Sequence, residues 1–239
     1  MIKIIVCENY DEMSKRAYRI MKEVLLKPNP VLGLATGSSP IGLYQEMIKD
    51  HKENNVSYKD VITFNLDEYA NLDINHPESY YSFMHKNLFS QVDIDSNNIN
   101  IPKGTGDLEA NCKEYDQRMK DYKLSIQVLG VGSNGHIGFN EPNTPFTITT
   151  HVVKLDESTR KDNSIYFDSL DQVPTHACTM GIANIMDAEK IILLASGKKK
   201  AKAISGMVNG EIVESLPASI LQRHPDVTVI IDKEAASEL

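Results

Sequence analysis

Short apolar runs alternate with amphipathic helical patterns along most of this chain, and this alternation limits the fold more than any other feature. Repeated strand–helix units predict a mostly parallel sheet with helices on both faces, which is an α/β architecture. We expect strands at Ile2–Cys7, Val31–Ala35, Val61–Leu66, Ser125–Leu129, Ile191–Ala195 and Val227–Asp232, and a short strand at His151–Leu155. We expect helices at Glu12–Leu26, Ile41–Lys52, Pro77–Phe89, Glu109–Tyr122 and Lys198–Val208.

The composition is that of a globular protein with a sizeable core, since 41% of the 239 residues are hydrophobic and 24% are charged. The chain has no internal repeat or flexible linker, so we expect a single domain over residues 1–239. The net charge of -8, with no basic block beyond Lys198–Lys200, argues against a nucleic-acid partner. No apolar run is long enough for a signal sequence or a membrane span. Three scattered cysteines suit the reducing cytoplasm.

A glycine-rich stretch, Gly130–Glu141, follows the predicted strand Ser125–Leu129 and carries chemically useful side chains. Its four glycines indicate backbone at positive φ or a close approach to a ligand. Asn134, His136 and Glu141 lie just beyond the carboxyl end of a strand, where open α/β sheets bind ligands. An imidazole suits proton transfer near neutral pH, and a nearby carboxylate can orient it. The alternative is an ordinary glycine-rich loop with a solvated histidine and glutamate.

Two predicted strand-to-helix turns have the composition of anion-binding sites. In Thr36–Pro40, the hydroxyl groups of Thr36, Ser38 and Ser39 add to the free N–H groups at the start of a helix. Lys198–Lys200 stand in the first turn of another helix, where cations oppose the helix dipole unless an anion is bound. Together the two turns favour a small phosphorylated substrate. The alternatives are a serine-capped helix start and a solvated run of lysines.

Asp67 and Glu68 follow the predicted strand Val61–Leu66, so an acid there faces the same crevice as His136. Partial burial against apolar neighbours raises a carboxyl pKa toward that of a useful base. We expect Asp67 to act in the site and Glu68 to be a helix-capping or loop acid. No metal site is expected, because the other candidate ligands are isolated and lack ligand spacing: His51, His85, His151, His176 and His224.

Four strings of residues stand out by their order and spacing. They are Leu34-Ala-Thr-Gly-Ser-Ser-Pro40, Thr63-Phe-Asn-Leu-Asp-Glu-Tyr69, His76-Pro-Glu-Ser-Tyr80 and Gly130-Val-Gly-Ser-Asn-Gly-His-Ile-Gly-Phe-Asn-Glu-Pro142. The strings resemble those of the glucosamine-6-phosphate deaminase family over nearly the whole chain, and the last is highly specific. The resemblance implies a Rossmann-like parallel sheet, shared with 6-phosphogluconolactonases and sugar-phosphate sensor domains. It also implies conversion of glucosamine 6-phosphate and water to fructose 6-phosphate and ammonia, without a metal or redox cofactor.

The resemblance also implies roles for single residues. Asp67 stands at the position of the base that removes the C2 proton, and His136 at that of the acid/base group that opens the sugar ring. Asn134 and Glu141 stand at the two positions that support the histidine. Some members have aspartate where this chain has Asn134, and a carboxamide can still hydrogen-bond an imidazole. The residues implied to bind the substrate phosphate are Thr36, Gly37, Ser38, Ser39 and Lys200.

The chain departs from the family pattern in two places. Members usually carry an arginine after an Asn-Ser pair, but Asn163-Ser164 is followed here by Ile165, and isoleucine cannot bind phosphate. Either Arg160 or Lys161 replaces that contact, or the phosphate is bound more weakly, or the substrate differs. The residues that bind the allosteric activator in longer members are unmatched, and so is their C-terminal extension. The resemblance therefore implies an unregulated short form that acts as a monomer.

Two other functions are compatible with the same fold. A 6-phosphogluconolactonase-like hydrolase would use a histidine to activate water, but Phe139-Asn140-Glu141 and Asp67-Glu68-Tyr69 favour the deaminase. A non-catalytic sugar-phosphate sensor would carry a DNA-binding segment, and a sheet that begins at Ile2 leaves no room for one. If the deaminase interpretation holds, Asp67 and His136 must face one cleft that also grips a phosphate.

Overall fold

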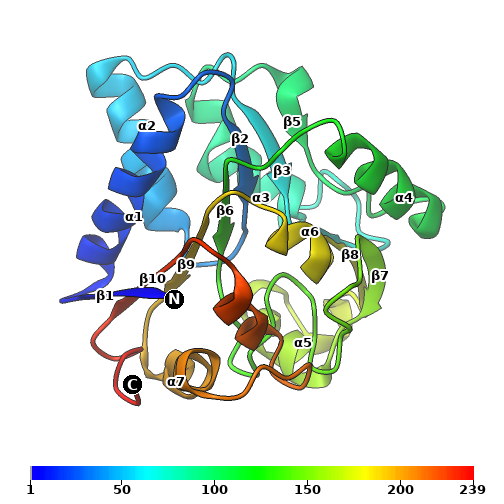
Figure 1. Ribbon diagram of the computed structural model, residues 1–239. Helices are drawn as coiled ribbons and strands as arrows, with labels where there is room; N and C mark the ends of the chain where they lie inside the picture. The colour runs from blue at the N-terminus through cyan, green and yellow to red at the C-terminus, as the bar shows by residue number, and fades with distance from the viewer. Residues whose placement is uncertain (1) are drawn as a thin grey trace.

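A computed structural model of the chain describes residues 2–239. Its centre is a seven-stranded parallel sheet in the order β1-β10-β9-β6-β2-β3-β5 (Figure 1). The strands of this sheet are β1 (Lys3–Cys7), β2 (Val31–Leu34), β3 (Ile62–Asn65), β5 (Ile99–Asn100), β6 (Ile126–Leu129), β9 (Ile191–Ala195) and β10 (Val227–Asp232). The predicted α/β fold with a mostly parallel sheet is confirmed.

Helices cover both faces of the main sheet because its strands are apolar on both sides. Every residue of β9 and of β10 is buried, as expected of central parallel strands. Figure 1 shows α1 (Tyr10–Leu25) and α2 (Ile41–Asn54) on one side of the sheet, and α6 (Ile182–Met186) and α7 (Ala201–Asn209) on the other. The remaining helices are α3 (Tyr80–Asn87), α4 (Leu108–Met119), α5 (Glu157–Asn163) and the short 3-10 helices η1 (Phe89–Gln91), η2 (Ser96–Asn98), η3 (Ser164–Tyr166), η4 (Leu170–Gln172), η5 (Lys198–Lys200) and η6 (Pro217–Arg223).

A second, three-stranded antiparallel sheet was not foreseen from the sequence. It consists of β4 (Asp67–Tyr69), β8 (His176–Thr179) and β7 (His151–Lys154), in that order. The strand expected at His151–Leu155 exists, but it belongs to this small sheet rather than to the parallel one. Leu66 joins the two sheets, because its N–H donates to the Leu34 carbonyl at 3.0 Å and its carbonyl accepts from the Met180 N–H at 2.6 Å.

Capping residues shift several helix boundaries away from the predicted ones. Helix α3 begins at Tyr80, because the Ser79 side chain caps it by accepting from the Ser82 N–H at 3.0 Å. Pro77 therefore precedes the helix instead of standing in its first turn. Lys198–Lys200 form η5 ahead of α7, so the expected single helix at Lys198–Val208 begins as a 3-10 turn. No helix within residues 2–239 combines the length and apolar character that crossing a membrane requires.

A close approach between β2 and β6 leaves no room for a side chain at Gly33 unless Gln127 moves. Gly33 is paired with Gln127, and a methyl group added at Gly33 would lie 2.0 Å from the Gln127 Oε1 atom. The Gln127 side chain is fully buried and fills the space that a side chain at Gly33 would need. The two strands lead into residues 35–40 and 130–141.

We expect Gly33→Ala to lower the free energy of unfolding by about 1–3 kcal/mol, the usual cost of overpacking a core. The measurement is urea denaturation followed by circular dichroism. In a Gln127→Ala background the same substitution should cost clearly less, because the clashing amide is gone. Equal costs in the two backgrounds would contradict this account of the strand pair.

Candidate active site

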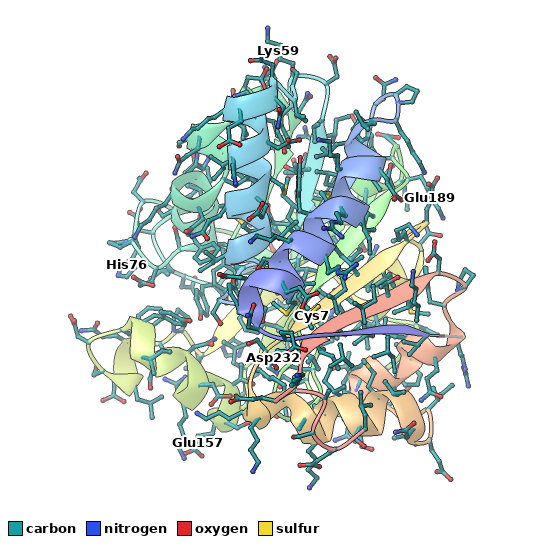
Figure 2. All side chains as sticks on the ribbon, turned by 90° about the vertical axis from the view of Figure 1, so that its left-hand side faces the viewer. Cys7, Lys59, His76, Glu157, Glu189 and Asp232 are labelled. Atoms are coloured by element: carbon teal, nitrogen blue, oxygen red, sulfur yellow. The ribbon has the colours of Figure 1, made fainter. Side chains whose placement is uncertain are left out.

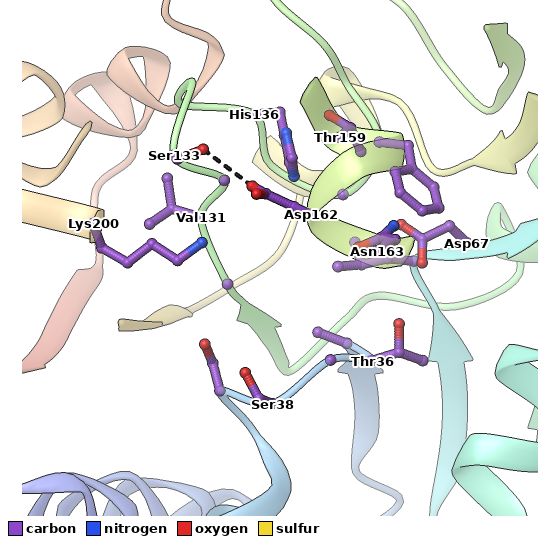
Figure 3. A pocket seen from close by; sticks show the side chains of 18 of the residues that line it. Thr36, Ser38, Asp67, Val131, Ser133, His136, Thr159, Asp162, Asn163 and Lys200 are labelled. Carbon is purple, nitrogen blue, oxygen red and sulfur yellow. Dashed lines mark hydrogen bonds between the residues drawn. The ribbon is translucent and has the colours of Figure 1, made fainter. Parts of the chain in front are cut away.

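The loop between β2 and α2, residues 35–40, forms one wall of a cavity at the carboxyl ends of the parallel strands. Gly37 has φ +89°, and nothing lies within 4 Å of the position a Cβ would take, so its backbone faces open space. The Tyr10 hydroxyl anchors this loop to α1. It donates to the Ser38 carbonyl and accepts from the Gly42 N–H, both at 2.8 Å. Thr36, Gly37, Ser38 and Ser39 all line the cavity (Figure 3).

The glycine-rich loop after β6 forms the second wall and is folded around His136. Gly132 donates its N–H to the His136 carbonyl at 2.9 Å, and the Gly135 N–H donates to the Gly132 carbonyl at 3.0 Å. A Cβ at Gly132 would lie 2.3 Å from two atoms of the His136 ring, so the imidazole rests directly on this glycine. The glycine density noted in the sequence therefore has a steric cause at this position.

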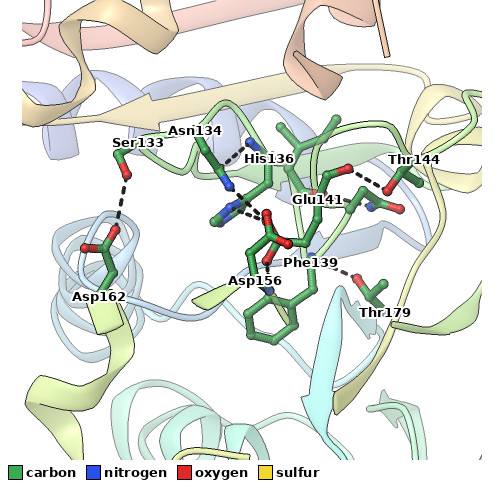
Figure 4. Close-up of polar contacts among 11 residues, drawn as sticks. Ser133, Asn134, His136, Phe139, Glu141, Thr144, Asp156, Asp162 and Thr179 are labelled. Carbon is green, nitrogen blue, oxygen red and sulfur yellow. Dashed lines mark hydrogen bonds and ion pairs between the residues drawn. The ribbon is translucent and has the colours of Figure 1, made fainter. Parts of the chain in front are cut away.

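Glu141 and Asn134 support the His136 ring from behind, and neither lines the cavity (Figure 4). The Glu141 Oε2 atom lies 3.5 Å from the buried Nδ1 of His136, which leaves Nε2 as the ring nitrogen open to a ligand. Asn134 donates from its amide to Glu141 at 3.0 Å and accepts from the His136 N–H at 3.2 Å. The Asp156 N–H also donates to Glu141, at 3.2 Å.

Glu141 is anionic in this environment. Burial alone would raise the pKa of Glu141, but its contact with His136 and the hydrogen bond from Asn134 outweigh burial and lower the pKa to about 2. The Glu141 carboxylate beside Nδ1 fixes the orientation of the ring and leaves Nε2 facing the cavity. The arrangement is that of a histidine prepared to carry a proton.

Asp67 and Glu68 lie on opposite sides of β4, as successive strand residues do. Glu68 accepts hydrogen bonds from the N–H groups of Tyr69, Tyr80 and Tyr81 at 2.8–2.9 Å, so it caps α3. The expectation that Glu68 is a helix-capping acid is confirmed. Asp67 instead lines the cavity while being only 5% exposed. Burial, helped by the charge of Glu68, raises the pKa of Asp67 to about 8.

Asp232 at the end of β10 positions the lysines of η5. Its carboxylate accepts from the Ser196 hydroxyl and from the Gly197 N–H, the latter at 3.1 Å, and Gly197 has φ +89°. Figure 2 shows Asp232 beside Cys7, its partner on the edge strand β1. Lys199 and Lys200 line the cavity from the turn that follows. Burial lowers the pKa of Lys200, and the neighbouring charges of Asp162 and Lys199 act in opposite directions on it.

Helix α5 and η3 close the cavity on its remaining side and correct one prediction. The Arg160 guanidinium donates to the carbonyls of Leu170 and Val173, both at 2.9 Å, so it points away from the cavity and is not available to a phosphate there. Lys161, the other expected replacement, does line the cavity, and its ammonium is paired with Glu157 at 2.8 Å. Ile165 lines the cavity with 77% of its surface exposed and offers no charge. Sequence reasoning did not single out four further lining residues: Thr159, Asp162, Asn163 and Tyr166.

These walls enclose one cavity of about 460 Å³ that both Asp67 and His136 line. The predicted single cleft is therefore present, and the serine loop and Lys200 stand in it as well. Tyr80, which ends one of the four strings, also lines it. Within residues 2–239 the structure has no cluster of three or more His, Cys, Asp or Glu able to hold a metal ion. A buried acid, a supported imidazole and an anion-binding end can together move protons on a small phosphorylated molecule.

Comparison with known proteins gives consistent results. The model of the family described as glucosamine-6-phosphate isomerases/6-phosphogluconolactonase matches residues 9–230. A glucosamine-6-phosphate deaminase of Clostridium botulinum (strain Kyoto / Type A2) is 53% identical, with 100% of this chain and 99% of the relative covered. A solved monomeric glucosamine-6-phosphate deaminase has 47% identity and a TM-score of 0.98, covering 99% of this chain and 100% of its own. The 6-phosphogluconolactonase of Trypanosoma brucei superposes with a TM-score of 0.81 over 100% of this chain and 99% of its own, but at 19% identity it shares only the fold.

The raised pKa of Asp67 predicts a stability effect with a definite sign. Folding favours the neutral carboxyl, so the stability present below the unfolded pKa of about 3.9 is lost as the pH rises through about 8. Asp67→Asn should therefore be more stable than the wild type near about pH 8, by a few kcal/mol, and this advantage should shrink toward about pH 4.5. Urea midpoints at the two pH values test this, with the exposed Asp168→Asn as control. A pH-independent difference would contradict the assignment.

Proposed function

Because the chain belongs to the family of glucosamine-6-phosphate isomerases and 6-phosphogluconolactonases, we propose that it is a glucosamine-6-phosphate deaminase. The reaction is conversion of glucosamine 6-phosphate and water to fructose 6-phosphate and ammonia. The observation that carries the proposal is that Asp67 and His136 line one cavity whose other end is rich in N–H, hydroxyl and ammonium donors. The deaminase is preferred over the lactonase because identity is 53% and 47% to deaminases but 19% to a lactonase.

The substrate phosphate is held by Thr36–Ser39 and Lys200, with Lys199 as a second cation. The loop supplies backbone and hydroxyl donors in an arrangement that Tyr10 keeps fixed, so little ordering is needed on binding. Lys199 adds the charge that Ile165 cannot provide. Holding the phosphate end fixes where the sugar carbons lie relative to the acid and the imidazole.

His136 opens the sugar ring. Its Nε2 accepts the proton of the anomeric hydroxyl and returns it to the ring oxygen, which breaks the C1–O5 bond and leaves an aldehyde at C1. Glu141, anionic and 3.5 Å from Nδ1, stabilises the imidazolium between the two transfers. Asn134 keeps Glu141 and the loop in register, which makes it a positioning residue.

Asp67 then transfers the proton that isomerises the sugar. Its carboxylate removes the C2 proton to give an enolamine, and the proton returns to C1. A second proton moves from the nitrogen to the C1 oxygen, which leaves an imine at C2 and a hydroxyl at C1. Water adds to C2 and ammonia leaves, so the products are fructose 6-phosphate and ammonia. A buried carboxyl with a pKa of about 8 is a much stronger base than an exposed one once it is ionised. We place this activity in the cytoplasm and assign it to the monomer.

Asp67→Asn should lower kcat for ammonia release by roughly 10³-fold or more, in line with the loss of a general base. Binding of fructose 6-phosphate should persist, because the phosphate contacts are untouched. The assay is ammonium release from glucosamine 6-phosphate, with unphosphorylated glucosamine and 6-phosphogluconolactone as comparison substrates. Unchanged turnover would remove Asp67 from the mechanism. Lactone hydrolysis without ammonium release from the wild type would replace the deaminase by the lactonase.

Tyr10→Phe removes the hydroxyl that anchors the serine loop and should act on phosphate binding rather than on chemistry. We expect KM for glucosamine 6-phosphate to rise by about three- to tenfold with kcat nearly unchanged, the pattern of a lost uniform binding contribution. Tyr122→Phe, at an exposed tyrosine outside the cavity, is the matched control. A fall in kcat at constant KM would assign Tyr10 to a different role.

A further inference from the structure

A carboxylate lies among the cationic groups of the cavity, and the proposed reaction gives it no role. Asp162 of α5 lines the cavity together with Lys199 and Lys200, and Figure 3 shows its carboxylate reaching from α5 toward Ser133. Its Oδ2 atom accepts a hydrogen bond from the Ser133 hydroxyl at 3.2 Å, which holds the carboxylate toward the glycine-rich loop (Figure 4).

An acid at this place weakens phosphate binding. Asp162 lies in the field of Lys200, whose ammonium is the principal cation for the phosphate end. Like charges disfavour each other most where water is partly excluded, so a phosphate dianion meets repulsion from Asp162. Lys161 also lines the cavity, but its ammonium is paired with Glu157 at 2.8 Å, so the negative charge of Glu157 offsets it. Such a residue favours a ligand that carries a positive charge as well as the phosphate.

Neither of the other two acids at the site presents a negative charge that could attract an ammonium group of the ligand. Asp67 is the other carboxylate lining the cavity within residues 2–239, and its burial favours the neutral form in the free protein. Glu141 lies behind His136 and is engaged by that ring, Asn134 and the Asp156 N–H. Asp162 is exposed to solvent and therefore presents its charge to whatever enters.

We propose that Asp162 is a specificity-determining residue, which favours sugar phosphates that carry an ammonium group over those that carry a hydroxyl in its place. The inference rests on the proposed function, since it concerns the substrate class of the same cavity. Asp162 lowers the affinity for every sugar phosphate by repelling the phosphate. In an amino sugar phosphate, its attraction for the ammonium group offsets this loss. Discrimination of this kind is a difference between two affinities, so it is measured as a ratio.

The test uses two reduced sugars that cannot react, 2-amino-2-deoxyglucitol 6-phosphate and glucitol 6-phosphate, bound to the full-length protein in calorimetric titrations at fixed low salt. The wild type should prefer the amine. Asp162→Asn should lower that preference about tenfold, with glucitol 6-phosphate bound as well as before or more tightly. Asp162→Glu should keep the preference, and Asp171→Asn, at an exposed acid outside the cavity, should leave both affinities unchanged. Higher salt should bring the preference of the wild type for the amine closer to that of Asp162→Asn, because salt screens the charge of Asp162.

The proposal is overturned if Asp162→Asn changes both affinities by the same factor, because Asp162 would then act on the phosphate alone. It is also overturned if the wild type binds the two ligands equally. Failure of the proposed function has a separate signature, which is a wild type that releases no ammonium from glucosamine 6-phosphate. Ammonium release together with an equal change in both affinities would retain the deaminase and discard only the role of Asp162.

Discussion

Parallel pairing of β2, β3, β6 and β9 brings their carboxyl ends to one edge of the sheet, and every part of the candidate site leaves from that edge. The serine loop follows β2, Asp67 follows β3, the His136 loop follows β6 and the lysines follow β9. Residues as far apart in sequence as 36 and 200 therefore meet at this edge because of the strand order. The small antiparallel sheet adds a second constraint, because pairing of β4 with β8 turns Asp67 inward instead of letting the chain continue as a loop.

Two carboxyl groups in this region differ in pKa from about 2 for Glu141 to about 8 for Asp67, and their surroundings explain the difference. Both are buried, so desolvation acts on each in the same direction. Glu141 is compensated by His136, Asn134 and a backbone N–H, whereas Asp67 receives no hydrogen bond from the rest of residues 2–239 and lies beside another acid. Their different environments therefore suit the two acids to different roles: Glu141 to stabilising a positive charge and Asp67 to accepting a proton.

Sequence reasoning predicted well where a physical signal is strong and local. Apolar strands, the glycine-rich loop and the serine turn each leave a local signal in the sequence. Six of the seven strands of the main sheet, and the positions of Asp67, His136 and Lys200, could therefore be predicted, whereas the two-residue strand β5 could not. The three-residue strand β4 and the seven-residue helix α5 are too short to show a period, so the small sheet and Asp162 could not. The orientation of Arg160 could not be predicted either. The direction in which a helical side chain points depends on tertiary packing, which the local sequence does not reveal.

The capping of α3 by Glu68 has a mechanical consequence. Glu68 accepts hydrogen bonds from the first two N–H groups of α3, and it is the residue next to Asp67 in the chain. Tyr80, the first residue of that helix, stands in the cavity wall. These hydrogen bonds tie the start of α3 to β4, so a ligand that displaces the Tyr80 ring is expected to shift Asp67 as well.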